Sequence, residues 1–161
     1  MAVDQWVAAG SECRLAPEGR TVQAYNQEAF HYFLALERTR AERSNRRLLL
    51  VLVSALPRSP AVGWRMDPRT AQRLFAALWL STRDADFIGW YRDGQTAGAV
   101  LTQRAKEPAG HVPRQIRARV AAALHAELSA RIRPALRIHV WPLMPKITDD
   151  AGADNQRTGT R

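Results

Sequence analysis

The sequence predicts one α+β domain: a ferredoxin-like β-α-β-β-α-β core, an extra N-terminal helix, and a mainly antiparallel sheet covered by helices on one face. Three observations lead to this prediction. Residues 48–56 form a continuous apolar run typical of a central strand, and residues 87–91 and 96–101 are extended runs on either side of an Asp-Gly turn. Other segments carry apolar residues at helical spacing. A chain of 161 residues suffices for one domain with one substantial core.

The chain begins with a segment that lacks a pattern and continues into a helix. Residues 1–24 show no sustained apolar period, so we expect a flexible N-terminal arm before a domain that spans residues 25–145. A helix is predicted from Asn26, which is an acceptable N-cap, to about Asn45. Its apolar side consists of Ala29, Phe30, Phe33, Leu34 and Leu36.

A buried strand and a second helix follow. The aliphatic run at 48–53 predicts a strand with both faces covered, which Pro57 ends. Asp67 as N-cap and Pro68 in the first turn predict the start of a helix. The side chains expected on its buried side are Ala71, Leu74, Phe75, Leu78 and Trp79.

A hairpin and a third helix come next. The hairpin is expected to run from Asp86 to about Gln103, because glycine in the Asp-Gly turn can adopt the positive φ that such turns need. A helix is predicted to open at Pro113 and to end before Pro134. Its buried side is predicted to be Ile116, Val120, Ala123, Leu124 and Leu128.

The last predicted element is a strand with one covered face. Apolar and polar side chains alternate there, in the order Leu136, Arg137, Ile138, His139 and Val140. Pro142 and Pro145 are expected to end the ordered structure. The polar residues 146–161 are expected to form a disordered C-terminal tail.

The composition favours anionic partners and a reducing compartment. The formal net charge is +9, and Lys106 and Lys146 are the only lysines, so nearly all of the positive charge is arginine. Such a surface suits nucleotides, nucleic acid, acidic proteins or anionic lipid, although a GC-rich genome would also enrich arginine. Cys13 is the only cysteine, so no internal disulfide can form. Without a signal-peptide core or an apolar run long enough to span a bilayer, we expect a cytoplasmic protein with no transmembrane segment.

The stretch from Arg83 to Leu101 resembles the core of a GGDEF domain, the fold of diguanylate cyclases. In that family an Arg-x-x-Asp element precedes a strand, and a Gly-Gly-Asp/Glu-Glu-Phe hairpin turn follows five residues after the Asp. Arg83 and Asp86 match the first element. Counted without gaps, the signature turn falls on Arg92, Asp93, Gly94, Gln95 and Thr96. The resemblance spans roughly residues 26–143 and implies the palm-like fold.

The acids that the resemblance implies for catalysis are missing. Cyclases of this family hold metal ions with one carboxylate at the end of the first strand and another in the signature turn. The first position falls at about Ser54, and the second falls on Gly94 and Gln95. A one-residue slip would bring Asp93 to the acid position, still without its partner. We therefore expect a degenerate domain with no catalytic residue, no metal site, no cofactor and no enzymatic activity.

Arg83 and Asp86 are the predicted ligand-binding residues. In active family members this element is the inhibitory product site, where Arg contacts phosphate or guanine and Asp accepts from guanine N–H groups of cyclic di-GMP. Because that ligand has two phosphates, a second arginine is required, with Arg69, Arg73 and Arg92 as candidates. The structural alternative is an Arg–Asp pair at a helix end on a solvated edge.

These residues favour a regulatory or binding domain, with cyclic di-GMP as the expected ligand. The resemblance implies a cyclic di-GMP-responsive process such as exopolysaccharide production. Two alternatives remain. The first is an inert scaffold that binds a protein partner or a second copy of itself. The second is an arginine-rich nucleic-acid-binding module. Trp90 and Tyr91 could stack on bases, but such hairpin aromatics usually pack in the sheet, and the pattern of RNA-binding ferredoxin-like domains is absent. His31, His111, His125 and His139 share no metal-ligand spacing.

Overall fold

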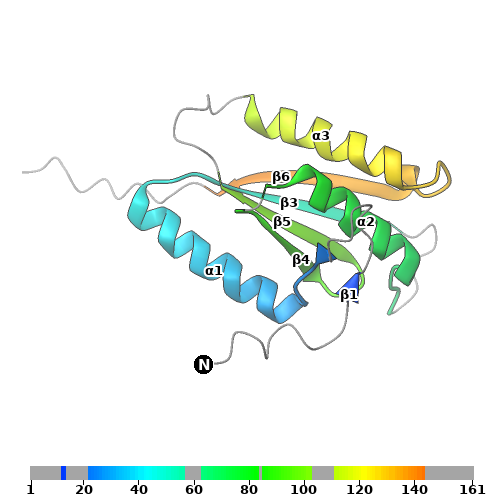
Figure 1. The fold of residues 1–161 in the computed structure, drawn as a ribbon, viewed down its shortest axis with the longest axis horizontal. Helices are drawn as coiled ribbons and strands as arrows, with labels where there is room; N and C mark the ends of the chain where they lie inside the picture. The colour runs from blue at the N-terminus through cyan, green and yellow to red at the C-terminus, as the bar shows by residue number, and fades with distance from the viewer. Residues whose placement is uncertain (1–11, 14–21, 57–62, 84, 103–110, 144–161) are drawn as a thin grey trace, which may run out of the picture.

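A four-stranded antiparallel sheet forms the centre of the protein (Figure 1). The computed structural model describes residues 12–13, 22–56, 63–83, 85–102 and 111–143. Its elements are β1 (Glu12–Cys13), β2 (Val22–Gln23), α1 (Gln27–Ser44), β3 (Leu48–Ala55), α2 (Pro68–Ser81), β4 (Phe87–Arg92), β5 (Thr96–Thr102), α3 (Val112–Glu127), a 3-10 turn (Arg133–Ala135) and β6 (Leu136–Leu143). The strand order β4-β5-β3-β6 confirms the predicted α+β, ferredoxin-like core.

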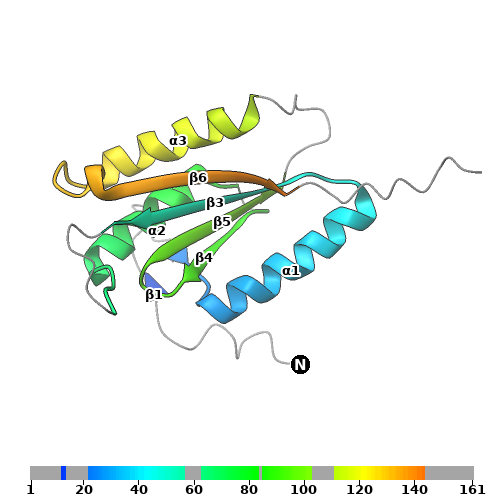
Figure 2. The ribbon, with the colours of Figure 1, turned by 180° about the vertical axis from the view of Figure 1, so that it is seen from behind.

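The helices occupy both faces of the sheet. Helices α2 and α3 pack against each other over one face, as predicted, whereas α1 lies against the opposite face (Figures 1 and 2). The prediction that helices cover one face only is therefore wrong for α1. The apolar patterns identify the buried side of each helix, but they do not tell which face of the sheet that side meets.

The helix boundaries follow from their caps. The Asn26 side chain accepts a hydrogen bond from the Ala29 N–H at 2.9 Å, and Asn45 ends α1 in the left-handed region with φ 49°. The Asp67 side chain accepts from the Thr70 N–H at 3.0 Å ahead of Pro68 in the first turn of α2. These starts and the end of α1 confirm the sequence predictions.

The central strand β3 is apolar on both faces, as its aliphatic run predicted. Leu49, Val51 and Val53 belong to the core beneath α2 and α3, together with Phe75 and Leu124. Leu50 and Leu52 lie on the α1 side, around the buried ring of Phe30. Alternate side chains of one strand therefore serve two separate cores.

Two paired glycines allow α1 to pack closely on the sheet. Gly89 of β4 pairs with Gly98 of β5, and the Phe30 ring lies directly over them. A Cβ built on Gly98 would lie 2.6 Å from Cζ of Phe30, and one on Gly89 would lie 2.6 Å from the Tyr25 carbonyl oxygen. Because any side chain here would displace the ring or the backbone, the close packing of α1 requires glycine at both positions.

The backbone of Tyr25 pairs with the outer edge of β4. Tyr25 forms a parallel bridge with Gly89, in which its N–H donates to the Ile88 carbonyl and its carbonyl accepts from the Trp90 N–H, both at 2.9 Å. Nearby in the chain, β1 and β2 pair antiparallel, and the sequence predicted no strand there. A pair of two-residue strands is too short to leave an alternating pattern.

The last strand runs further than expected. β6 continues through Pro142 to Leu143, where Pro142 pairs with Leu49. Because β6 is an edge strand, proline can sit in it with its missing N–H on the open side. Pro145, the predicted tail at 146–161 and most of the predicted arm at 1–24 lie outside the described residues.

Candidate nucleotide-binding site

The predicted site residues lie at opposite ends of the β4–β5 hairpin. Arg83 and Asp86 lie at its base, between α2 and β4, whereas Arg92, Asp93, Gly94, Gln95 and Thr96 form its tip. Strand β4 has six residues, so at about 3.3 Å per residue the two places are roughly 20 Å apart. The structure therefore contains two separate candidate sites.

At the base, Asp86 is held by backbone groups on both of its carboxylate oxygens. Oδ2 accepts from the Arg83 N–H at 2.8 Å, and Oδ1 accepts from the Thr102 N–H at 3.1 Å. The Asp86 N–H in turn donates to the Arg83 carbonyl at 2.9 Å. These bonds fix the orientation of the half-buried carboxylate and connect the end of β5 to the loop before β4. They also give Asp86 a structural role.

The Arg83 side chain is exposed at the surface beside this turn, and it makes contacts of its own. It approaches Asp86 through its backbone, since the N–H and the carbonyl of residue 83 both bond to residue 86. An alanine at position 83 would therefore keep both backbone hydrogen bonds of the turn.

At the tip, the turn is tied to α1 and to the loop before α2. Gly94 has φ 66° and its carbonyl accepts from the Met66 N–H at 2.6 Å. The Asp93 N–H donates to Oε1 of Gln27 at 2.7 Å, and the Asp93 carboxylate forms an ion pair with Arg65. Asp93 is the carboxylate nearest the acid position of the GGDEF turn, and its cationic partner is Arg65.

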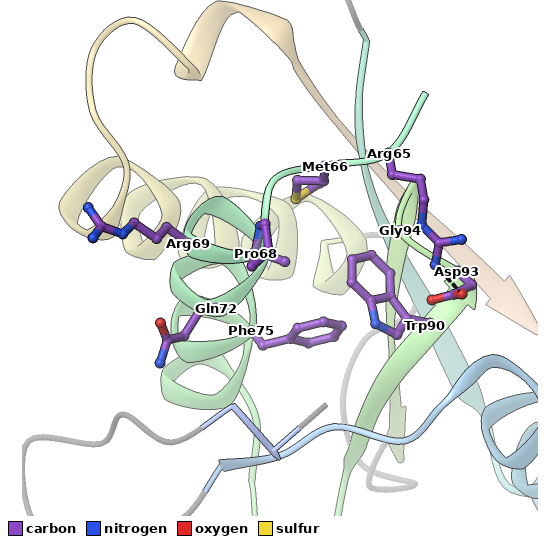
Figure 3. A pocket seen from close by; sticks show the side chains of 10 residues that line it. Arg65, Met66, Pro68, Arg69, Gln72, Phe75, Trp90, Asp93 and Gly94 are labelled. Carbon is purple, nitrogen blue, oxygen red and sulfur yellow. Dashed lines mark hydrogen bonds and ion pairs between the residues drawn. The ribbon is translucent and has the colours of Figure 1, made fainter. Parts of the chain in front are cut away.

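A pocket of about 440 Å³ lies between this turn and α2 (Figure 3). Phe75 and Trp90 meet edge to face in its apolar part, with ring centroids 4.9 Å apart. Arg65 and Asp93 line its rim as a pair, while Arg69 points away from Trp90. This pocket could not be predicted from the sequence, because Arg65 lies in an irregular loop and only the fold brings it to the turn.

A second pocket of about 380 Å³ lies beyond the loop before α2, between the end of β3 and the start of β6. Its lining includes Trp64, Arg65, Asp67 and Arg131. The pKa of Asp67 is lowered by hydrogen bonds from the Thr70 side chain and backbone N–H, so the carboxylate is ionised as the N-cap of α2. Asp67 therefore serves the helix rather than a ligand.

The fold matches solved structures, although no protein-family model and no curated protein matches the sequence. A diguanylate cyclase from Thermotoga maritima superposes with a TM-score of 0.53 at 16% identity, over 75% of this chain and 81% of that one. The GGDEF domain of YfiN (TpbB) from Pseudomonas aeruginosa gives 0.53 at 14%, over 74% and 71%. The GGDEF domain of DgcB from Caulobacter crescentus, in complex with c-di-GMP, gives 0.52 at 13%, over 74% and 70%.

The chain has the fold of a GGDEF domain. The resemblance seen in the sequence is thereby confirmed at the level of the fold. Within this GGDEF fold, Ser54 at the end of β3 pairs with Thr96 beside the turn, so the two positions expected to carry acids are neighbours. Ser54 lies on the α1 face with Leu52, by strand alternation, and away from the pocket beside Trp90.

The residues at the tip of this GGDEF fold do not fit a catalytic metal ion. Mg²⁺ prefers carboxylate oxygens, and here one carboxylate, that of Asp93, is already paired with Arg65. β3 contains no Asp or Glu. Throughout the ranges that the structure describes, no three His, Cys, Asp or Glu side chains are grouped closely enough to hold a metal.

The remaining sequence predictions concern packing and the membrane. Trp90 is buried against Phe75, and the half-buried Tyr91 ring contacts His31, whose Nε2 lies 2.8 Å from the Tyr91 carbonyl. Both hairpin aromatics are thus packing residues. Among the described helices, none is long and apolar enough to cross a membrane.

Proposed function

We propose that this chain is a GGDEF-fold domain without cyclase chemistry that binds a cyclic dinucleotide, cyclic di-GMP, at Arg83 and Asp86. The observation that carries the proposal is the orientation of the Asp86 carboxylate by two backbone N–H groups beside an exposed arginine. A second support is the shared fold with the DgcB domain that was solved with c-di-GMP.

The geometry at Asp86 suits recognition of guanine. A carboxylate oxygen has two lone pairs, so each oxygen can accept from a ligand while it accepts from a backbone N–H. A carboxylate that is already oriented loses little side-chain entropy on binding. The planar Arg83 guanidinium offers forked N–H donors to phosphate oxygens or to the edge of guanine.

A second arginine is available at the same end of the sheet. Thr102, which binds Asp86, pairs with Leu48 at the start of β3, and the exposed Arg46 and Arg47 immediately precede Leu48. Arg69 and Arg92, the candidates from the sequence, lie toward the hairpin tip, and Arg73 donates to the Glu127 carbonyl at 3.4 Å. We therefore assign the second phosphate to Arg46 or Arg47.

Substitution of Arg83 by alanine should weaken binding of cyclic di-GMP about 10- to 100-fold, because one charge-assisted contact is worth about 1.5–3 kcal/mol. The measurement is isothermal calorimetry at physiological salt. Since Asp86 accepts from the backbone N–H of residue 83, this substitution removes the guanidinium and leaves the turn intact. Arg47→Ala should also reduce affinity.

The matched control is Arg137→Ala, which removes an exposed arginine from the opposite end of the sheet and should leave binding unchanged. Asp86→Asn should impair selection of guanine over adenine, and it should lower the melting temperature as well, since one backbone N–H loses its acceptor. If wild-type protein shows no saturable, guanine-selective binding, the receptor proposal fails and a scaffold function replaces it.

Incubation with GTP and Mg²⁺ or Mn²⁺ should yield no cyclic dinucleotide, because a carboxylate is missing at Ser54 and at the Gly94-Gln95 position. Chromatography of the reaction mixture measures the product. The informative variant is Asp93→Ala: product formed by wild-type protein and lost in this variant would mean that Asp93 supports catalysis despite its pairing with Arg65.

A further inference from the structure

An exposed aromatic pair lies on β6, on the same face of the sheet as α1. His139 and Trp141 are two residues apart and share this face with Arg137, while Ile138 and Val140 point to the α3 side. Trp141 has 56% of its surface exposed, and His139 is exposed too. Among the described elements, α1 contacts the sheet mainly at β4, the edge strand opposite β6 (Figure 2).

The two rings are exposed and nearly parallel. Their planes differ by 19° and their centroids are 6.4 Å apart, close to the spacing of about 6.6 Å between alternate residues of a strand. Leu52 and Leu50 of β3 lie beside the rings on the same face, because they pair with His139 and Trp141. A planar base can stack on such rings whatever its sequence, because every base has a π-face.

Arginines lie at the end of the sheet nearest the β4–β5 turn. Four paired residues form one row across the sheet, in the order Arg137, Ser54, Thr96 and Arg92. The two exposed arginines at its ends are separated by three strand spacings of about 4.8 Å, or roughly 14 Å. β3 and β6 contain no Asp or Glu. The whole chain carries a net charge of +9.

We propose that this face of β3 and β6 binds single-stranded nucleic acid, with bases stacked on His139 and Trp141 and the phosphate backbone near Arg137 and Arg92. Single strands fit because only unstacked bases can reach the rings, whereas a duplex keeps its bases inside. An acidic protein would pair with the arginines, but its carboxylates would not stack on the two exposed rings. The proposal is independent of the cyclic dinucleotide site.

The test is fluorescence anisotropy with a 5′-labelled single-stranded RNA 12-mer of mixed sequence, at 150 mM salt, with full-length protein. Trp141→Ala should weaken binding at least tenfold, within the roughly 5- to 150-fold range of one stacked base. The matched control is Tyr32→Ala, which removes an aromatic ring with 64% exposure from α1 and should change affinity less than twofold. Both variants should retain the wild-type circular dichroism spectrum.

Charge variants complete the test. Arg137→Ala should reduce affinity and flatten the salt dependence, whereas Arg117→Ala on α3, over the other face, should have a smaller effect. Arg83→Ala should leave RNA binding intact, which separates this site from the dinucleotide site. Equal binding of duplex RNA, equal effects of Trp141→Ala and Tyr32→Ala, or a Trp141→Ala effect confined to self-association in sedimentation would each overturn the proposal.

Discussion

Replacement of Phe30 by alanine should lower the free energy of unfolding by about 3–5 kcal/mol, the usual cost of removing a fully buried phenylalanine ring. Phe30 is 0% exposed and joins α1 to the sheet above Gly89 and Gly98. The measurement is urea unfolding followed by circular dichroism. A loss below 1 kcal/mol would mean that α1 contributes little to the stability of the domain.

The Gly98→Ala substitution tests the same contact from the sheet. In the wild-type background the Cβ of the new alanine would lie 2.6 Å from Phe30 Cζ. We therefore expect this overpacking to lower the free energy of unfolding by about 1–3 kcal/mol. In a Phe30→Ala background the clash is gone, and Gly98→Ala should be neutral or stabilising because alanine restricts the unfolded chain. Additive effects of the two substitutions would contradict direct packing of the ring on Gly98.

Leu124→Ala should cost about 2–5 kcal/mol, because Leu124 is 1% exposed in the core between α3 and the sheet and its loss leaves a cavity. The matched control is Leu80→Ala on α2, where the leucine is 61% exposed and the cost should stay below about 0.5 kcal/mol. The same unfolding measurement compares both variants. Similar losses in the two would place Leu124 outside the core.

Much of the fold could be predicted from local signals. The aliphatic run of β3, the caps at Asn26 and Asp67 and the Asp-Gly turn each specify an element through its own residues. The position of α1 on the opposite face could not be predicted, because it depends on a hollow made by Gly89 and Gly98 on two different strands. A glycine in a strand indicates a close approach without naming the partner.

Only part of the candidate site could be predicted from the sequence. The spacing of Arg83 and Asp86 comes from one short stretch, whereas the bond from Thr102 to Asp86 depends on hairpin register. The Arg65–Asp93 pair joins residues that are 28 positions apart in the chain. The proximity of Arg46 and Arg47 to Asp86 follows from the pairing of Leu48 with Thr102, which no local pattern reveals.

The position of β3 has a consequence for synthesis of the chain. β3 is central in the sheet, yet it is the first of the four strands to be made, and its second neighbour, β6, is the last. Until β6 leaves the ribosome, the aliphatic β3 has an unpaired edge, which can recruit other chains. A truncated product that ends before Leu136 would keep this edge permanently, so such fragments should aggregate.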